Sequence, residues 1–366
     1  MEAKTIMKIG IRVDSGTMVG TGHLYRCLAV ARIARAQGHT LTFVGKAHTG
    51  HVLAVARDAG FGVSELDVLP GESGPWHHSA WTGGPVFADG VASAHACAAD
   101  VWLCDHYGLD DRWVEGLRSQ GDRAPVVWLD DIGDRPLGAT HVVDPSGCAT
   151  VERWRVLCPQ AQIHQGPLWA PLDPVFGAEP VASDARNGML LFFGGVDAPN
   201  ATGRTLDALA QTDWRGDVAI VVGGANPHRP ILERQVRDLP FTTTLHSGLT
   251  PTQMRGLMDQ ARTAVGCGGM SAWERASAGL PTLITHIADN QIHSADSMDA
   301  VGAAWRLPPP HDPAFPHAVG LGITHLQSPD HWALMSQAAR AFCDGKGGPR
   351  LVELLIHATH HGAFPC

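Results

Sequence analysis

The amino-acid sequence predicts an α/β protein with two doubly wound domains, each a parallel sheet between helices. Three observations support this prediction. The chain has 366 residues, more than one hydrophobic core usually serves. Short apolar runs alternate with helical patterns along its length. A stretch rich in proline and glycine, residues 166–188, has no clear period and separates an earlier set of runs from a later one.

Nine apolar runs are expected to form strands. Continuous runs of this kind are typical of strands buried on both faces, as in parallel sheets. The runs cover residues 7–13, 40–45, 101–105, 125–131, 140–144, 189–195, 218–224, 261–267 and 281–287. Helical patterns lie between them, for example at 24–37, 202–210 and 271–278. The alternation gives repeated βαβ units and therefore two doubly wound sheets.

These patterns also predict the domain boundaries. They are an N-terminal domain at 7–165, a linker at 166–188, a C-terminal domain at 189–327 and a helical tail at 328–366. A second irregular stretch, residues 71–85, is expected to be a surface insertion.

Charge and hydropathy exclude several classes of partner. The net charge is −9 and no run of Lys and Arg occurs, so a nucleic-acid partner is not expected. No apolar run approaches the length of a membrane span, and the first residues lack the apolar segment of a secretory signal. We therefore expect a cytoplasmic location.

Cysteines and histidines are numerous, but neither group predicts a metal. The eight cysteines include no C-x-x-C pair, which favours buried free thiols in a reducing compartment. Histidine clusters at 76–78 and 357–361 are expected to be solvated, because no carboxylate or cysteine obviously completes a ligand set nearby. We expect neither a metal nor another cofactor.

The first segment that carries chemistry follows the first strand and opens a helix. Gly20 and Gly22 allow a tight turn whose backbone comes close to a ligand. His23 stands in the first helical turn, where the helix N-terminus favours a neutral imidazole that can take a proton from water. Asp14 is expected to join the catalytic group, and Gly22 and Arg26 to contact the substrate. The alternative is a histidine that only caps the helix.

Two more segments follow buried strands, at the edge of the sheet where ligands bind in such folds. Tyr107 lies in the run CDHYGLD, and its phenol can orient a sugar hydroxyl or the attacking water; the alternative is a tyrosine that only packs. Asp130 and Asp131 end another strand. A carboxylate pair suggests acid/base work, but such residues are also common in turns, so one of the two is expected to be structural.

Glycine pairs in the second half predict a nucleotide site. Gly268 and Gly269 turn from a buried strand into a helix, where backbone N–H groups and Ser271 can hold a diphosphate. Glu274, one turn further, can accept from both ribose hydroxyls. The alternative is an ordinary turn followed by an exposed Glu–Arg pair.

Two other turns are weaker candidates. Gly194, Gly195 and Asp197 form a second possible anion cradle, with a plain strand-to-helix turn as the alternative. Asn290 and Gln291 lie at a polar tip before a helix and are expected to reach the substrate.

The order and spacing of these segments resemble the UDP-sugar hydrolases of pseudaminic-acid biosynthesis, which are related in fold to the GT-B glycosyltransferase that makes lipid II. The matching motifs, within residues 7–307, are GTGHLYRCLAVA, DHYG, LDD, FFGGVDAPN, GGANPH, GCGGMSAWERASAGLP and NQ. The resemblance implies a GT-B-like architecture of two Rossmann-type domains facing a cleft. It places the catalytic histidine in the N-terminal domain and UDP in the C-terminal one.

The resemblance also implies a reaction. A metal-independent enzyme would hydrolyse a UDP-activated 2,4-diacetamido-2,4,6-trideoxy sugar, with water attacking the anomeric carbon and UDP leaving. His23 matches the general base, and Tyr107 and Asn290 match residues near the sugar. The residues that match the UDP loop are Gly269, Ser271 and Glu274. The implied partner is the UDP-sugar alone, bound by a monomer.

The sequence departs from the family at three places. They are the run GPLWAPLDPVF, Met270 in the UDP loop and the strand end VVDPS. These differences concern the identity of the sugar more than the class of reaction.

Three other functions share many of these features. They are a GT-B glycosyltransferase that moves an amino sugar from UDP to an acceptor, a nucleotide-sugar binding protein without catalysis, and a hydrolysing 2-epimerase. The single G-T-G-H before Arg26, where the glycosyltransferase usually has a G-G-T-G-G-H type loop, favours the hydrolase.

Overall fold

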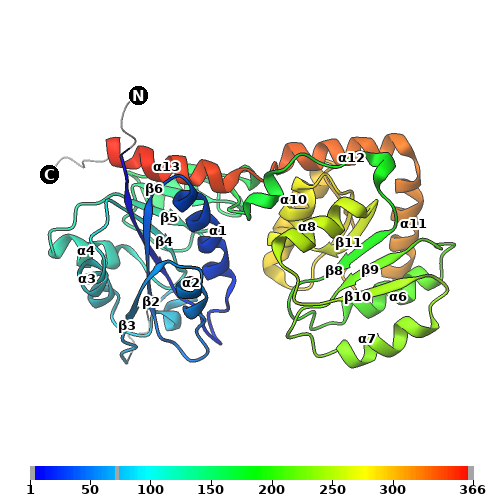
Figure 1. Cartoon of the computed structure of the whole chain (residues 1–366), viewed down its shortest axis with the longest axis horizontal. Coiled ribbons are helices and arrows are strands. Elements are labelled where there is room, and N and C mark those ends of the chain that lie inside the picture. Colours follow the sequence, from blue (N-terminus) through cyan, green and yellow to red (C-terminus); the bar gives the residue numbers. More distant parts are fainter. Residues whose placement is uncertain (1–4, 71–73, 362–366) are drawn as a thin grey trace. The chain divides into compact units, whose positions relative to one another are not determined.

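The computed structural model describes residues 5–70 and 74–361, and the expectations for 71–73 and 362–366 lie outside them. The chain divides into two compact units, drawn in Figure 1. Unit 1 is Met1–Asp173 with Gly347–Cys366, and unit 2 is Pro174–Lys346. The change of unit falls inside the stretch 166–188.

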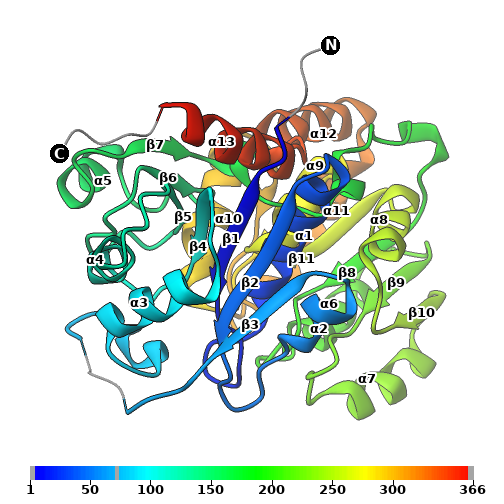
Figure 2. The ribbon, with the colours of Figure 1, turned by 60° about the vertical axis from the view of Figure 1, so that its left-hand side comes forward.

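Unit 1 holds a parallel sheet in the order β3-β2-β1-β4-β5-β6-β7, which Figure 2 shows from the side of β2 and β3. Its strands are β1 (Lys8–Val13), β2 (Thr40–Lys46), β3 (Gly62–Leu66), β4 (Val101–Asp105), β5 (Val126–Leu129), β6 (His141–Asp144) and β7 (Gln162–Gln165). Its helices are α1 (Gly22–Ala36), α2 (Ala54–Asp58), α3 (Val86–Ala96), α4 (Asp111–Ser119), α5 (Val151–Leu157) and α13 (Gly347–His361), with 3-10 turns η1 (Ser79–Thr82) and η2 (Pro167–Trp169).

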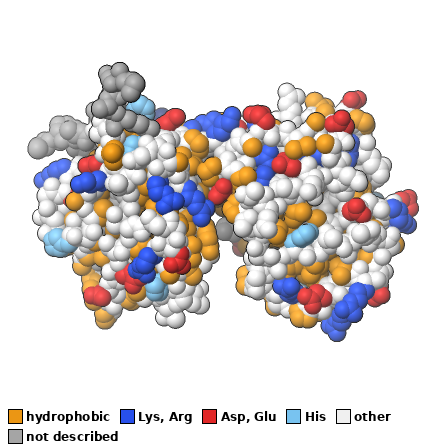
Figure 3. All heavy atoms as spheres, viewed as in Figure 1, with side chains coloured by type: hydrophobic (Ala, Val, Ile, Leu, Met, Phe, Trp, Pro, Cys, Tyr) orange, Lys and Arg blue, Asp and Glu red, His pale blue; other side chains and the backbone are white. Residues whose placement is uncertain are grey.

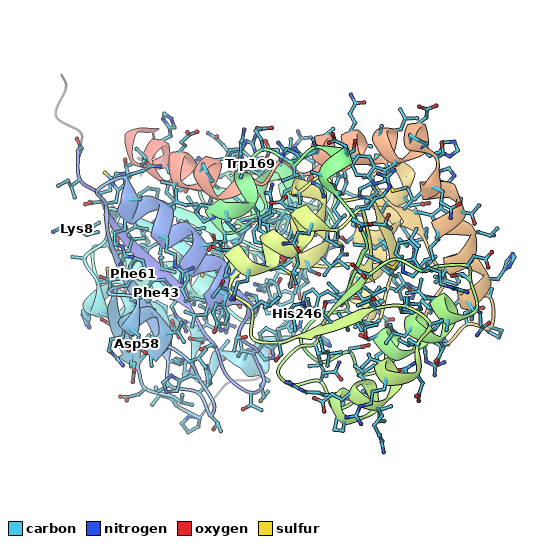
Figure 4. All side chains as sticks on the ribbon, turned by 45° about the vertical axis from the view of Figure 1, so that its right-hand side comes forward. Lys8, Phe43, Asp58, Phe61, Trp169 and His246 are labelled. Carbon is cyan, nitrogen blue, oxygen red and sulfur yellow. The ribbon has the colours of Figure 1, made fainter. Side chains whose placement is uncertain are left out.

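Both faces of this sheet are buried against helices. On one face, strand residues such as Leu103 pack with α1 and α13. Phe43 and Phe61, labelled in Figure 4, belong to this layer, with ring centroids 5.5 Å apart. On the other face the indole of Trp113, in α4, packs edge-on against two strand tryptophans at 5.6 and 5.7 Å. This double covering explains the continuous apolar runs of the strands.

Unit 2 holds a second parallel sheet, in the order β10-β9-β8-β11-β12-β13. Its strands are β8 (Met189–Phe192), β9 (Val218–Val221), β10 (Thr243–His246), β11 (Thr263–Cys267), β12 (Thr282–Thr285) and β13 (Trp305–Arg306). Its helices are α6 (Ala201–Ala210), α7 (Arg229–Gln235), α8 (Pro251–Gln260), α9 (Met270–Ser277), α10 (Ile292–Ala300), α11 (Phe315–Gln327) and α12 (Pro329–Phe342), with 3-10 turns η3 (Pro174–Gly177), η4 (Ser183–Ala185), η5 (Val236–Asp238) and η6 (Asp289–Gln291).

The predicted fold class is confirmed, since each of the nine apolar runs contains a strand. The four strands that were not predicted, β3, β7, β10 and β13, are the outer strands of the two sheets. An outer strand has a neighbour on one side only, and QIHQ or TTLH shows no continuous apolar run. The segment 328–366, expected as one tail, is divided, because α12 lies in unit 2 and α13 in unit 1.

Each sheet has a point where the strand order reverses. In unit 1 it lies between β1 and β4, and in unit 2 between β8 and β11. Ligands of doubly wound folds bind outside the carboxyl ends of the strands at such a point. The segments that carry the expected chemistry follow β1, β4, β8 and β11.

The outer surface adds two observations. Figure 3 shows acidic and basic side chains interspersed over the drawn face of each unit. Within the described ranges, no helix is long and apolar enough to cross a bilayer.

Candidate active site

His23 lies in the first turn of α1 and is held by a carboxylate from a neighbouring strand. Its Nδ1 atom is 2.6 Å from Oδ1 of Asp105, the last residue of β4. An ionised carboxylate can only accept hydrogen bonds, so the Nδ1 atom carries the proton. In the neutral form of the ring, the Nε2 atom then keeps its lone pair. This is the tautomer that a general base needs.

Arg26, one turn further along α1, fixes Asp105 in place. Its Nε and Nη2 atoms donate to the two carboxylate oxygens, both at 2.6 Å. Burial alone would raise the pKa of Asp105, but the charge of Arg26 and the interaction with His23 outweigh it and hold the pKa well below its usual range. The guanidinium of Arg26, a residue expected to contact the substrate, binds Asp105 and approaches Asp131 at 3.4 Å.

Tyr107, which the sequence placed near the sugar, lies beside His23. The two ring centroids are 4.5 Å apart and the rings meet edge to face. The phenol donates a hydrogen bond to Asp131. Burial, and then the Asp131 carboxylate, raise the pKa of Tyr107 well above its usual value, so the phenol stays protonated. The neighbouring Asp130 is structural, since it accepts from the turn N–H groups of Ile132 and Gly133.

The segment 74–85 is more than the surface insertion expected from the sequence. The Trp81 ring centroid lies 6.1 Å from that of His23 and 6.0 Å from that of Tyr107. His78, expected to be solvated, is partly buried and packs on Trp81 at 4.4 Å. A buried cation anchors this segment, because Lys46 Nζ donates to the backbone oxygen of Thr82 at 2.6 Å. The result is an aromatic wall beside the histidine.

Asp14, expected in the catalytic group, does not contact His23. It is fully buried and accepts from Arg12 Nη1 at 2.6 Å, from His106 Nε2 at 3.0 Å and from His48 Nε2 at 3.1 Å. Burial lowers the pKa of His106 despite this partner. Asp14 thus organises the network beneath the loops.

A cavity of about 270 Å³ opens at the loops of unit 1. Its lining is Thr17, Met18, Val19, Ala47, His48, Thr49, Val68, Ala80 and Trp81. Trp81 is the residue that this lining shares with the surroundings of His23, since its ring centroid lies 6.1 Å from that of the histidine.

In unit 2, Gly268 and Gly269 connect β11 to α9. Gly269 has φ +99°, and a Cβ built there meets nothing within 4 Å. No described side chain caps α9, and its first turn holds no acidic residue. The first N–H groups of a helix have no partner within it. The N–H of Ala272 donates to the backbone oxygen of Gly269 at 2.9 Å, so among the described residues it is the N–H groups of Met270 and Ser271, with the Ser271 hydroxyl, that the turn can present to an anion.

The other glycine turn is arranged differently. Gly194, with φ +88°, and Gly195 follow β8, but Asp197 turns its carboxylate onto α6. It accepts from the N–H groups of Ala201 and Thr202 at 2.7 and 3.0 Å. The first N–H groups of α6 are thus bound by the chain itself, so the expected contact of Asp197 with UDP is not the one its geometry supports.

The polar tip before α10 reaches the α9 turn through one of its two residues. A Cβ on Gly268 would lie 2.7 Å from the backbone oxygen of Gln291, so these segments are in close contact. The side chain of Gln291 accepts from the N–H of Ile287. Asn290 is exposed, and Glu274 lies partly exposed one turn into α9.

Two residues of the site were not selected from the sequence. Asp105 belongs to the DHYG motif, but the sequence does not indicate whether its carboxylate contacts His23 or is exposed to solvent. Trp81 lies in a run without period, where only the density of Trp and His, GPWHHSAW, marked the segment.

Comparison with known proteins supports the fold. No family model matches the chain. The spore coat polysaccharide biosynthesis protein SpsG of Bacillus subtilis (strain 168) is 30% identical over 214 residues, 57% of this chain and 62% of that protein. The match thus covers about three fifths of the curated relative.

Solved structures with the same fold are more distant in sequence. MurG of Acinetobacter baumannii has a TM-score of 0.70 at 15% identity, over 96% of this chain and 100% of that one. The glycosyltransferase of kitacinnamycin has a TM-score of 0.65 at 15% identity, over 97% and 99%. Anabaena Alr3699/HepE, solved with UDP-glucose, has 0.60 at 14% identity, over 96% and 100%. The chain has a GT-B glycosyltransferase-like fold.

Proposed function

We propose that the chain is an enzyme that hydrolyses a UDP-activated amino sugar, with His23 as the general base. The observation that carries the proposal is the contact of His23 Nδ1 with Asp105, which leaves Nε2 free to accept a proton. The expected substrate is a UDP-linked 2,4-diacetamido-2,4,6-trideoxy sugar. The relative named for polysaccharide biosynthesis supports a role in making a surface carbohydrate.

The proposed reaction needs only one base and a stabilised leaving group. A water molecule gives a proton to Nε2 of His23 while its oxygen attacks the anomeric carbon. The bond between that carbon and the diphosphate oxygen breaks, and its electron pair leaves with UDP. Asp105 stabilises the imidazolium that forms, and Tyr107 orients the sugar or the water.

Unit 2 supplies the nucleotide site in this proposal. The N–H groups at the start of α9 and the hydroxyl of Ser271 bind the diphosphate, and Glu274 accepts from the ribose. Gly194 and Gly195 leave space for the uracil of UDP. Asp197 holds the turn that follows them by capping α6. The N–H groups at α9 also stabilise the charge that develops on the leaving group.

Transfer to an acceptor is the second candidate. It is supported by the glycosyltransferases among the similar folds and by the cavity next to Trp81, which has room for part of an acceptor. In that case His23 would deprotonate an acceptor hydroxyl instead of water.

UDP release in the absence of an acceptor tests the proposal. The purified chain is incubated with several UDP-2,4-diacetamido sugars in buffer alone, and UDP is measured. Hydrolysis predicts stoichiometric UDP and free sugar. No release with any of them, followed by release on addition of an acceptor, would replace hydrolysis with transfer.

A further inference from the structure

Arg275 is a buried cation without a carboxylate partner. Three arginine side chains of the described chain are among its largest fully buried groups. Arg12 pairs with Asp14 and Asp89, and Arg135 pairs with Asp130 and Asp134. Arg275 has no ion pair with any residue that the structure describes. Such groups are rarely buried without a partner because their desolvation is costly.

The few partners of this guanidinium lie at the start of α9. Nη2 donates to the backbone oxygen of Cys267 at 2.8 Å, and Nη1 donates to Ser271 Oγ at 3.3 Å. Within the described residues, Nε has no acceptor. Burial lowers the pKa of Arg275, and the electrostatic interactions with Cys267 and Glu274, which raise this pKa, do not outweigh the burial.

The strand beneath is shaped to admit the guanidinium. Gly266 lies in the middle of β11, and a Cβ there would stand 2.8 Å from Nη1 and 2.9 Å from Cζ of Arg275. Glycine in a strand interior often marks a close approach of another group. The absence of a side chain at Gly266 therefore leaves room for the guanidinium of Arg275 against β11.

We propose that Arg275 is the fixed counter-charge of the diphosphate site at the start of α9, acting through Ser271 without contacting the ligand. The inference rests on the proposed UDP site. Because Ser271 Oγ accepts from Nη1, its own hydrogen points away from the guanidinium and is available to an anion. The ligand's diphosphate then supplies the negative charge that the chain withholds, and Arg275 is a positioning residue.

The test compares ligands that differ only in phosphate. UDP, UMP and uridine are titrated calorimetrically into the full-length wild type, Arg275→Met and Arg275→Lys. Arg275→Met should weaken the binding of UDP about tenfold or more, the scale of one charge-assisted contact, and leave the affinity for uridine unchanged. Arg275→Lys keeps the charge, so its affinity for UDP should lie between those of wild type and Arg275→Met. The lysine variant also provides the measurement if the methionine variant does not fold.

Thermal unfolding gives a readout that a purely structural role would not produce. Without ligand, Arg275→Met should unfold at the same or a higher temperature than wild type, because an unpaired buried charge is removed. The rise in unfolding temperature caused by UDP should shrink. The matched control is Arg255→Met, whose guanidinium is also buried in unit 2 but pairs with Asp259; there the ratio of UDP to uridine affinity should be that of wild type.

The two possible failures are distinct. If wild type binds UDP and both Arg275 variants keep its UDP-to-uridine ratio, Arg275 is not the counter-charge, and the UDP site stands. If wild type binds no UDP, the proposed nucleotide site itself is wrong.

Discussion

Nδ1 of His23 lies 2.6 Å from Oδ1 of Asp105, although the two residues are 82 positions apart in the chain. The contact joins the first turn of α1 to the end of β4, on the two sides of the point where the strand order reverses. Arg26 holds the same carboxylate from the next turn of α1. A helix, a strand and an ion pair thus fix which nitrogen of the imidazole faces the carboxylate.

Replacing His23 should abolish turnover and spare nucleotide binding. His23→Ala removes the proton acceptor, so UDP release should fall by about 10²-fold or more, the usual contribution of a general base. The Kd for UDP should stay within about twofold of the wild-type value, because the proposed nucleotide site lies in unit 2. A twofold change is small compared with the tenfold change that about 1.4 kcal/mol of binding energy produces. Steady-state UDP release and calorimetry measure the two quantities. Unchanged turnover would remove His23 from the mechanism.

Asp105→Asn tests the orientation of the imidazole. The amide cannot stabilise the imidazolium and allows the other tautomer, so turnover should fall by about 10²- to 10⁴-fold. Arg26 also loses the nearer of its two charged partners and keeps only Asp131 at 3.4 Å, so the unfolding temperature should drop. Asp131→Asn is the matched control, since Asp131 bonds Tyr107 and not His23; a larger loss of turnover there than in Asp105→Asn would contradict the assignment.

Trp81 should affect substrate affinity more than chemistry. It forms part of the wall beside His23 and lines the neighbouring cavity. Trp81→Leu removes an aromatic contact worth about 1 kcal/mol and should raise KM roughly fivefold, with kcat changed less. Trp76→Leu, in the same segment, serves as control. Equal KM values for wild type and Trp81→Leu would exclude Trp81 from the substrate site.

Ser271 is expected to contribute directly to UDP affinity. Ser271→Ala removes a donor to a charged phosphate, a contact worth about 1.5–3 kcal/mol, so the Kd for UDP should rise about tenfold or more. Ser297→Ala, on α10 of the same unit, should leave it unchanged. A Kd for UDP that Ser271→Ala does not alter would place the diphosphate elsewhere.

A histidine outside the site should make stability depend on pH. His141, in β6, is buried beside the ring of His164, and burial lowers the pKa of His141 to about 4 from its usual 6.5. Between these values the unfolded chain binds a proton that the folded chain does not. The stabilisation is therefore complete above pH 6.5 and is lost as pH falls toward 4.

The measurement is the unfolding temperature between pH 4 and 7.5. His141→Gln should flatten its decline below pH 6.5 relative to wild type. The control His95→Gln, at an exposed position, should follow the wild-type curve. A His141→Gln curve that parallels wild type would show that other groups control the acid limb.

The central strands and the position of His23 could be predicted from the sequence because buried parallel strands and a glycine turn leave local patterns. Its partner could not. Asp14 directly follows β1 and Asp105 ends the adjacent strand β4, and only the packed structure decides which one meets the imidazole. The orientation of Asp197 could not be predicted for a related reason: a carboxylate before a helix can face a ligand or cap that helix, and here it caps α6.

The outer strands, and the aromatic wall formed by Trp81 with His78 and Tyr107, could not be predicted from local sequence patterns. The outer strands β3, β7, β10 and β13 need no continuous apolar run. The segment that carries Trp81 is held by Lys46, the last residue of β2, through the backbone oxygen of Thr82. Both depend on contacts between segments distant in the chain.

The central claim is that His23 activates water for attack at the anomeric carbon. It is tested most directly by incubating the full-length chain and a UDP-2,4-diacetamido sugar in water labelled with oxygen-18, without an acceptor, and analysing the products by mass spectrometry. The account predicts label at C1 of the free sugar, none in UDP, and loss of both products with His23→Ala. Label in the phosphate of UDP, or no cleavage until an acceptor is added, would contradict it.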